Sequence, residues 1–190
     1  GRDYGSLMPT NLYGPGDNFD LKGSHVLPAL MRKFHEAARS GQHEVEVWGT
    51  GTPRREFLHV DDLAEACLFA LQLPQARYAA ETEVMRSHLN VGTGVDVTIR
   101  ELAEKCAQAT GFKGAIRFNP QYPDGTPRKL LDVSRISRLG WRARIGLDDG
   151  LRETYRWYLE HSAELRGAAL GELEGSPGPQ PLPLRCAERR

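Results

Sequence analysis

Residues 4–18 read YGSLMPTNLYGPGDN and set the pattern of the whole chain. Residues 4–12 are predicted to be an extended strand. Residues 13–18 are predicted to be a turn, because Gly, Pro and Asn favour sharp reversals. A helix is predicted next, from an N-cap at Ser24 to about Arg39. A strand that passes through a turn into a helix is typical of folds that mix the two kinds of element.

The rest of the chain continues this mixture. Gly41 is expected to end the first helix, and Thr98 and Glu101 form a capping box, since they stand three residues apart before a periodic apolar run. The sequence contains no internal repeat. The fold class is therefore α/β or α+β. The predicted strands are residues 45–48, 55–59, 88–91 and 115–119, and the later helices are predicted near residues 60–71, 98–107, 134–139 and 147–163.

Two of the predicted helices carry apolar stripes. The stripe of the first comprises Val26, Leu30, Phe34 and Ala37. The stripe of the second comprises Val60, Leu63, Ala64, Cys67, Leu68 and Leu71. Both stripes are expected to be buried. Asp61 and Asp62 are better explained by the start of the second helix, where negative charge is favourable, than by a pair of catalytic carboxylates.

The balance of charge limits the partners that the surface as a whole could attract. The 190 residues include 25 Lys and Arg against 25 Asp and Glu, so the formal net charge is zero. Such a surface has no general field for nucleic acid or for an anionic membrane. No apolar run approaches the roughly 20 residues that a membrane-spanning helix needs. We therefore expect no nucleic-acid partner, no membrane partner and a cytoplasmic location, with any bound anion held by local groups.

The cysteines give no sign of a metal site. Cys67 and Cys106 fall on the apolar faces of predicted helices, and Cys186 lies near the C-terminus. None of them stands at the short spacings that are typical of metal ligands. Cys67 and Cys106 are therefore expected to be buried free thiols, and no metal site is predicted.

The two ends of the chain suggest a fragment with a tail. The first residue is Gly1 rather than Met, and the strand-like pattern begins almost at once. Residues 1–166 are therefore expected to form one part of a larger domain. From residue 167 the composition changes to Gly, Glu and Pro, with near alternation of prolines between Pro177 and Pro183. Residues 167–190 are therefore expected to be a disordered tail.

Two stretches are more specific than periodicity. They are Pro9-Thr10-Asn11-Leu12-Tyr13-Gly14-Pro15 and Arg55-Glu56-Phe57-Leu58-His59-Val60-Asp61-Asp62. In this order they resemble two signatures of the extended short-chain dehydrogenases/reductases that act on nucleotide sugars. Within that superfamily, the chain is similar to the GDP-L-fucose synthase family over about residues 1–166. The further similarity is carried by Asp17-Asn18-Phe19, Ser24-His25-Val26-Leu27-Pro28-Ala29-Leu30, Trp48-Gly49-Thr50-Gly51-Thr52-Pro53-Arg54-Arg55 and Pro123-Asp124-Gly125-Thr126-Pro127-Arg128-Lys129.

The resemblance implies both a fold and a reaction. The fold would be α/β, namely the C-terminal part of an extended Rossmann-type fold, with the last strands of the parallel sheet and the smaller α/β substrate-binding domain. Enzymes of this family convert GDP-4-keto-6-deoxy-D-mannose to GDP-L-fucose by inverting C3 and C5 and reducing the C4 ketone with NADPH. The resemblance therefore implies a GDP-sugar substrate, NADPH as the cofactor, and a homodimer when the protein is full length.

Several catalytic parts of that family are missing from this sequence. The family's glycine-rich cofactor loop, its Ser and Tyr-x-x-x-Lys motif, and its epimerisation Cys all precede the region that resembles this chain. Gly49-Thr50-Gly51 is expected between two extended pieces rather than between a strand and a helix, so it does not replace the loop. The chain alone is therefore predicted to be inactive. A non-catalytic GDP-sugar-binding module, or another nucleotide-sugar epimerase or dehydratase, remains an alternative.

The resemblance assigns one catalytic residue and one cofactor-binding segment. His25 would be the acid of the epimerisation, which needs groups on both faces of the sugar ring, and an imidazole exchanges protons near neutral pH. His25 could instead be merely the polar first residue of a helix. Pro9, Thr10, Asn11 and Leu12, together with His25, would meet the nicotinamide end of NADPH. Asn11 could equally hold the turn.

The resemblance also assigns substrate contacts to Lys33, Trp48, Arg55, Asp124 and Lys129. Arg and Lys side chains suit the oxygens of a pyrophosphate, and a Trp ring offers a flat surface to guanine or sugar. Lys33 stands where other members often carry Arg, which leaves its role open. Each residue has a structural alternative: solvated charge for the lysines, an ion pair for Arg55, packing for Trp48 and a turn for Asp124.

Overall fold

The structure is a computed structural model that describes residues 5–21 and 23–171, with the backbone alone for residues 164–171. The chain divides into two compact units, Gly1–Leu159 and Glu160–Arg190. The described strands and helices α1 to α5 all lie in the first unit. The elements are β1 (Ser6–Pro9), β2 (Asn11–Tyr13), α1 (Val26–Ser40), β3 (Glu44–Trp48), β4 (Arg54–His59), α2 (Val60–Gln72), α3 (Gln75–Ala80), β5 (His88–Val91), β6 (Asp96–Thr98), α4 (Ile99–Thr110), β7 (Ala115–Asn119), β8 (Arg128–Lys129), α5 (Ser134–Leu139) and α6 (Leu147–Gly171).

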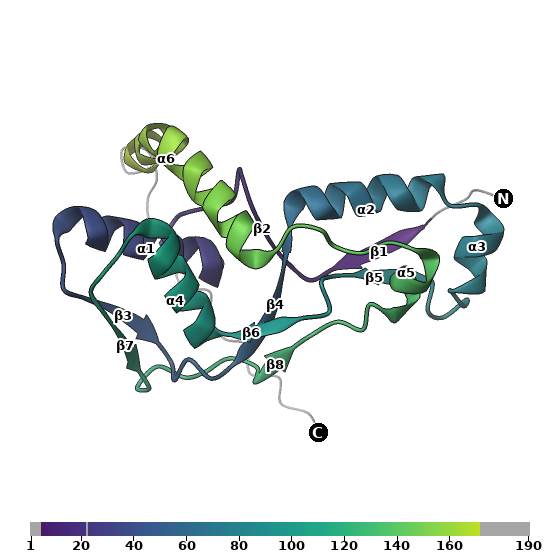
Figure 1. Ribbon diagram of the computed structural model, residues 1–190, viewed down its shortest axis with the longest axis horizontal. Coiled ribbons are helices and arrows are strands. Elements are labelled where there is room, and N and C mark those ends of the chain that lie inside the picture. Colours follow the sequence, from purple (N-terminus) through teal and green to yellow (C-terminus); the bar gives the residue numbers. More distant parts are fainter. Residues whose placement is uncertain (1–4, 22, 172–190) are drawn as a thin grey trace, which may run out of the picture. The chain divides into compact units, whose positions relative to one another are not determined.

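The strands are mostly parallel, and their mixture with helices confirms the α/β class. β1 pairs with β5, β2 with β4, and β3 with β7, all in parallel. β4 also pairs in parallel with β8 and antiparallel with β6. Helices α1 and α4 pack together beside β3 and β7, whereas α2 runs alongside the β1 and β5 pair (Figure 1). This architecture agrees with the C-terminal part of a larger parallel-sheet fold, as the resemblance implies.

The first predicted strand is split in two at Thr10. β1 and β2 flank this residue, and Thr10 N donates a hydrogen bond to Val91 O at 3.0 Å. The break transfers the chain from β5 to β4, because β1 and β2 have different partners. The predicted turn follows at Gly14, where φ is 148° and an added Cβ would lie 2.6 Å from Val60 Cγ2. Only glycine fits this position, which brings the turn close to the start of α2.

The start of α1 differs from the prediction, although its end agrees. The N-cap is His25 rather than Ser24, because His25 still has extended backbone with φ −68° and ψ 165°. The Ser24 hydroxyl is buried without a hydrogen-bond partner among the described residues. Val26 is 37% exposed, and the buried side of the helix begins at Leu27. Gly41 ends the helix in the left-handed region, with φ 68°, as predicted.

The burial predicted for α2 is wrong at four of the six residues of its stripe, Ala64, Cys67, Leu68 and Leu71. Leu68 is 61% exposed and Leu71 is 83% exposed, and Cys67 is also exposed. The buried residues of this helix are instead Asp62 and Ala66, because the helix meets the strands through that side. Val60 and Leu63 are partly buried, with Leu63 packed against the core, whereas the rest of the predicted stripe is exposed. The prediction that Cys67 is a buried thiol is therefore wrong.

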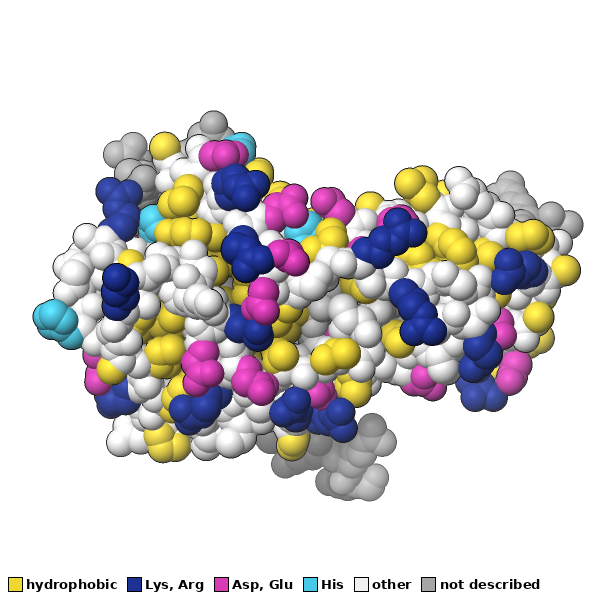
Figure 2. Space-filling model, in the orientation of Figure 1, with side chains coloured by type: hydrophobic (Ala, Val, Ile, Leu, Met, Phe, Trp, Pro, Cys, Tyr) yellow, Lys and Arg dark blue, Asp and Glu magenta, His cyan; other side chains and the backbone are white. Residues whose placement is uncertain are grey.

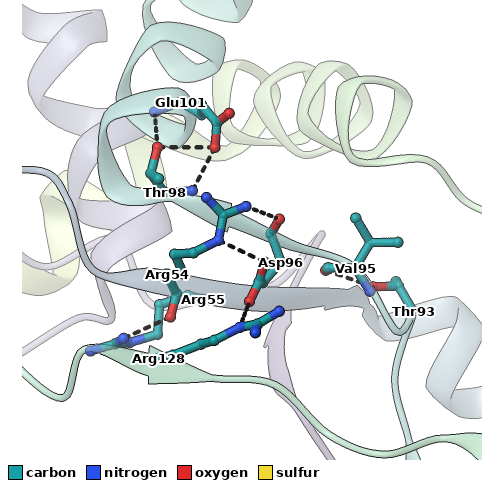
Figure 3. Close-up of polar contacts among 8 residues, drawn as sticks. All are labelled: Arg54, Arg55, Thr93, Val95, Asp96, Thr98, Glu101 and Arg128. Atoms are coloured by element: carbon teal, nitrogen blue, oxygen red, sulfur yellow. Dashed lines mark hydrogen bonds and ion pairs between the residues drawn. The ribbon is translucent and has the colours of Figure 1, made fainter.

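Helix α4 agrees with its prediction at both the N-terminus and the core. Thr98 Oγ1 accepts a hydrogen bond from Glu101 N at 3.0 Å, and Glu101 Oε2 accepts one from Thr98 N at 2.7 Å. These two bonds confirm the capping box (Figure 3). Cys106 is fully buried as predicted, and burial raises the pKa of its thiol to about 12. Cys186 lies outside the described residues.

Helix α6 is longer than the sequence predicts. It continues to Gly171 rather than ending near residue 163, because residues 164–170, ELRGAAL, are mostly strong helix formers. The first part of the expected tail, residues 167–171, is therefore helical, and residues 172–190 lie outside the description. Within residues 5–21 and 23–171, no helix combines the length and apolarity needed to cross a membrane, and no group of His, Cys, Asp and Glu is arranged to hold a metal ion.

Candidate functional site

A cavity of about 600 Å³ lies at the junction of β1 and β2. This volume is within the range of small-molecule sites, about 300–1,000 Å³. Three separate segments contribute to it: the strand junction, the start of α1, and β8 with the residues that follow. The lining residues are Pro9, Thr10, Asn11, Leu12, His25, Lys129, Leu130 and Leu131. The structure thus brings all the residues predicted to meet the cofactor to one cavity, together with one predicted substrate contact.

His25 lies at the start of α1, with its side chain exposed beside this cavity. Its backbone belongs to the first turn of the helix, since Ala29 N donates to His25 O at 3.1 Å. Burial raises the pKa of the nearby Asp17 carboxyl, and a hydrogen bond from Asn18 N and the charge of His25 partly oppose this rise. An exposed imidazole at a cavity can exchange protons with both solvent and a bound molecule. Its position suits the predicted acid, and it also suits a plain N-cap.

The side chains of the strand junction hold the sheet together. Asn11 Nδ2 donates to Glu56 O at 2.7 Å, and Thr10 Oγ1 donates to the same oxygen at 3.3 Å. Both bonds attach the junction to β4. The Asn11 side chain thus has a structural role, which is to attach the strand junction to β4. Residues 9–12 line the cavity with backbone and side chains that these two bonds hold in place.

Lys129 reaches the cavity from the two-residue strand β8, whose residues are both exposed. A buried carboxylate anchors this short strand. Asp96 Oδ2 accepts from Arg128 Nε at 2.5 Å, and Asp96 Oδ1 accepts from Arg54 Nε at 2.8 Å (Figure 3). These bonds hold the pKa of the Asp96 carboxyl below its usual value. The sequence does not predict that Arg54, Asp96 and Arg128 meet, because they lie on three separate strands, β4, β6 and β8.

Leu130 and Leu131 also line the cavity, but nothing in the sequence except their position after Lys129 indicates this. Leu131 N donates to Glu56 Oε2 at 3.0 Å, and Gly94 N donates to Glu56 Oε1 at 2.7 Å. The Glu56 side chain is fully buried. It therefore joins the segment after β8 to the turn after β5 and fixes one wall of the cavity.

Lys33 and Trp48 form a second group of predicted contacts. Trp48 is 60% exposed, and Lys33 Nζ lies 5.1 Å from the centroid of its ring. The ring of Tyr122, which the sequence does not single out, is stacked on Trp48 at 4.5 Å and 17°. The packing alternative for Trp48 therefore applies only to this exposed aromatic pair, and not to the core.

Arg55 and Asp124 make internal contacts that hold loops. Arg55 Nη1 donates to Arg54 O at 2.8 Å and to Thr126 O at 2.6 Å. Asp124 accepts from Thr50 N at 2.9 Å and from Thr50 Oγ1 at 2.6 Å, and these bonds lower the pKa of its carboxyl. The Arg55 side chain also lines a different cavity, of about 270 Å³, between β4, β6 and the residues before α6. The structure does not place either residue at the 600 Å³ cavity.

The charges around these groups are local. Figure 2 shows basic and acidic side chains interspersed over the face that it presents, with no large area of one sign. This distribution agrees with the zero net charge of the chain. An anion at the candidate site would therefore be held by individual groups such as Lys129 or Lys33 and not by a general field.

The class of protein is indicated by a family match to one part of the chain. Residues 1–92 match the family described as the NAD dependent epimerase/dehydratase family. This part contains His25 and both signature stretches, residues 9–15 and 55–62. The epimerase/dehydratase family domain is thus present in this part of the chain.

Individual relatives narrow the class. The chain is 56% identical over 167 residues to the GDP-L-fucose synthase of Escherichia coli (strain K12), which covers 88% of the chain and 52% of that protein. It is 55% identical over 161 residues to GDP-L-fucose synthase 1 of Arabidopsis thaliana, covering 85% of the chain and 47% of that protein. A solved structure of a GDP-L-fucose synthetase from Naegleria fowleri bound to NADP matches with a TM-score of 0.73 and 27% identity, covering 84% of this chain and 47% of that one.

The chain is therefore homologous to the GDP-L-fucose synthases over most of its length. It spans about half the length of the curated relatives that it matches. The predicted resemblance is confirmed.

The matched family is described as NAD dependent, and the related structure from Naegleria fowleri is bound to NADP. The pyrophosphate of a dinucleotide is usually bound where a strand turns into a helix. Gly49-Thr50-Gly51 instead joins β3 to β4, so the prediction that it is not a phosphate loop is confirmed.

Proposed function

We propose that the protein containing this chain makes GDP-L-fucose by 3,5-epimerisation and NADPH-dependent 4-reduction of GDP-4-keto-6-deoxy-D-mannose. The observation that carries the proposal is that Pro9, His25 and Lys129 line one and the same cavity. The identity with GDP-L-fucose synthases supports the choice of nucleotide sugar. The present residues would contribute the epimerisation acid, the rim of the nicotinamide site and substrate contacts. A homodimer is proposed on the resemblance alone, and a cytoplasmic location is proposed as the sequence predicts.

His25 is proposed to act as a proton donor at the sugar ring. C3 and C5 both adjoin the C4 ketone, so a proton removed from one face leaves charge that the ketone oxygen shares. The inversion is completed when an acid on the other face gives a proton back to the carbon. The exposed imidazole at the cavity can do this and then recover a proton from solvent. NADPH, when bound, would supply the hydride that reduces the ketone.

The GDP part of the substrate is proposed to meet the basic and aromatic groups. Lys129 at the cavity provides a point charge for a phosphate oxygen, and Lys33 beside Trp48 provides another. Trp48 offers an exposed ring. Arg55 and Asp124 remain proposed contacts, in addition to the loops that they hold.

Replacing His25 by Asn in the full-length natural protein tests the reaction. The imidazole is lost while the side chain keeps a similar size, so we expect the epimerised product to fall by about 10²–10⁴-fold. NADPH-dependent reduction of the ketone should persist at least in part. The product stereochemistry, read by NMR, separates the two steps. An unchanged product would remove His25 from its proposed role.

One observation favours a second function, which is GDP-sugar binding without catalysis. None of the tyrosines in these 190 residues has Lys four positions later, so the Tyr-x-x-x-Lys motif is missing from this sequence. Calorimetric titration of the folded chain with GDP-mannose tests this function, and the absence of any heat would exclude it. NADPH oxidation by the isolated chain with the keto-sugar would contradict both this function and the predicted inactivity of the chain.

A further inference from the structure

The loop between β7 and β8 contributes an aromatic side chain to one of the predicted substrate contacts. Tyr122 is 41% exposed, and its ring stacks on that of Trp48 with 4.5 Å between centroids and 17° between planes. Two neighbouring rings with this much exposed area are unusual for a pair with only a packing role, since buried aromatic surface is what stabilises a fold. The pair therefore needs an explanation other than the core.

The loop is fixed to the end of β3 on both sides of Tyr122. Before it, Asn119 is the register partner of Trp48, Gly49 N donates to Asn119 O at 2.9 Å, and Tyr122 N donates to the same oxygen at 3.3 Å. After it, both carboxylate oxygens of Asp124 accept bonds from Thr50. The ring of Tyr122 is thus presented to Trp48 by a loop with little freedom to move away.

A cation completes this group. Lys33 Nζ, from α1, lies 5.1 Å from the centroid of the Trp48 ring. An ammonium is attracted by the face of an indole, so the orientation of Trp48 also affects where Lys33 lies. Flat aromatic surface next to a positive charge suits a nucleobase that carries phosphate groups. The three side chains come from three different elements, and Trp48 is the member that contacts both of the others.

We propose that Tyr122 is a positioning residue of the nucleotide site: its stacked ring holds the Trp48 indole, and through it the Lys33 ammonium, in the orientation that a bound GDP group meets. This inference rests on the proposed function for the identity of the ligand. It adds a residue that acts through Trp48, whereas His25 and Lys129 act at the cavity. The affinity for GDP should therefore depend on the aromatic ring of residue 122 and not on its hydroxyl.

Titration of GDP into the full-length natural protein, followed by calorimetry, tests the inference. Tyr122→Ala and Tyr122→Leu should both raise the dissociation constant for GDP by about three- to tenfold, because an aromatic pair contributes to stability beyond its buried area. Tyr122→Phe should restore binding to within about twofold. The thermal midpoints of all three variants should stay close to that of the parent, since the side chain is exposed.

A double-mutant cycle shows whether Tyr122 acts through Trp48. With Trp48→Ala already present, Tyr122→Ala should cause no further loss of affinity. The emission spectrum of Trp48, obtained by difference against Trp48→Phe, should change in Tyr122→Ala without any ligand and return in Tyr122→Phe. A parent that binds GDP as tightly as Tyr122→Ala does would overturn the inference, and so would an equal loss in the Trp48→Ala background. A folded parent that gives no heat with GDP would instead overturn the proposed function, and the inference with it.

Discussion

Helices α1 and α2 have apolar stripes of similar spacing, but the α1 stripe is buried from Leu30 onward, whereas most of the α2 stripe is exposed. Phe34 and Ala37 of α1 are at most 1% exposed, and Phe34 packs on Phe112 just after α4 at 5.4 Å. Leu68 and Leu71 of α2 are mostly exposed, and the same helix buries the carboxylate of Asp62. The difference shows that periodicity identifies a helix and its apolar side, whereas burial also needs a partner element, which α4 provides for α1.

The thiols of α2 and α4 should differ most. We expect Cys67 of the 190-residue chain to react with a maleimide on the order of 1,000-fold or more faster than Cys106, whose reaction requires unfolding of the core. The high pKa that burial gives to Cys106 further reduces its reactive thiolate. Peptide mapping by mass spectrometry identifies the labelled residue. Equal protection of both thiols would mean that the stripe of α2 is covered, and the contrast with α1 would be lost.

Truncation of the two stripes should have unequal costs. Phe34→Ala removes a fully buried ring, and we expect it to lower the free energy of unfolding by about 3–5 kcal/mol. Leu71→Ala is the matched control, because its side chain is 83% exposed and the loss should be within about 0.5 kcal/mol. Urea denaturation of both variants measures the difference. A similar loss for the two would contradict the burial seen here.

The starts of the two helices should respond differently to losing a polar group. Asp62 accepts hydrogen bonds from Arg144 N and Ile145 N, at 3.0 to 3.2 Å. Asp62→Ala leaves these N–H groups without their acceptor, which should cost about 1–3 kcal/mol. Ser24→Ala, before α1, removes a hydroxyl that has no partner among the described residues and should change stability by less than about 0.5 kcal/mol. Denaturation midpoints that rank the two variants in the opposite order would refute this.

The smallest expected effect concerns the pH dependence contributed by Asp17, which precedes α1. Burial raises the pKa of its carboxyl in the folded state. Its stabilising contribution is therefore complete below the unfolded pKa and is lost as pH rises through the folded pKa. Asp17→Asn removes this titration, so the variant should gain stability relative to the parent as pH rises above the ordinary Asp pKa of about 4. Thermal midpoints that keep a constant difference as pH rises past this value would show that Asp17 titrates normally.

Much of the candidate site could be predicted because its residues lie in specific local motifs. The stretch at residues 9–15 and the segment around His25 were sufficient to indicate the family and the cofactor side of the cavity. Asp96, Glu56 and Tyr122 could not be predicted in the same way. Each acts on residues more than thirty positions away, through β4, β8 or β3, and no local pattern records such contacts.

The sequence by itself determined the C-terminal end of α1 and the start of α4. The left-handed Gly41 and the capping box of Thr98 and Glu101 depend on residues within one helical turn, so composition and spacing are enough to specify them. The tertiary structure alone decided the split of the first strand at Thr10, the exposure of the α2 stripe, and the meeting of His25 with Lys129 at one cavity. These features depend on which distant elements pair and which faces they cover, and that is settled only when the sheets and helices pack.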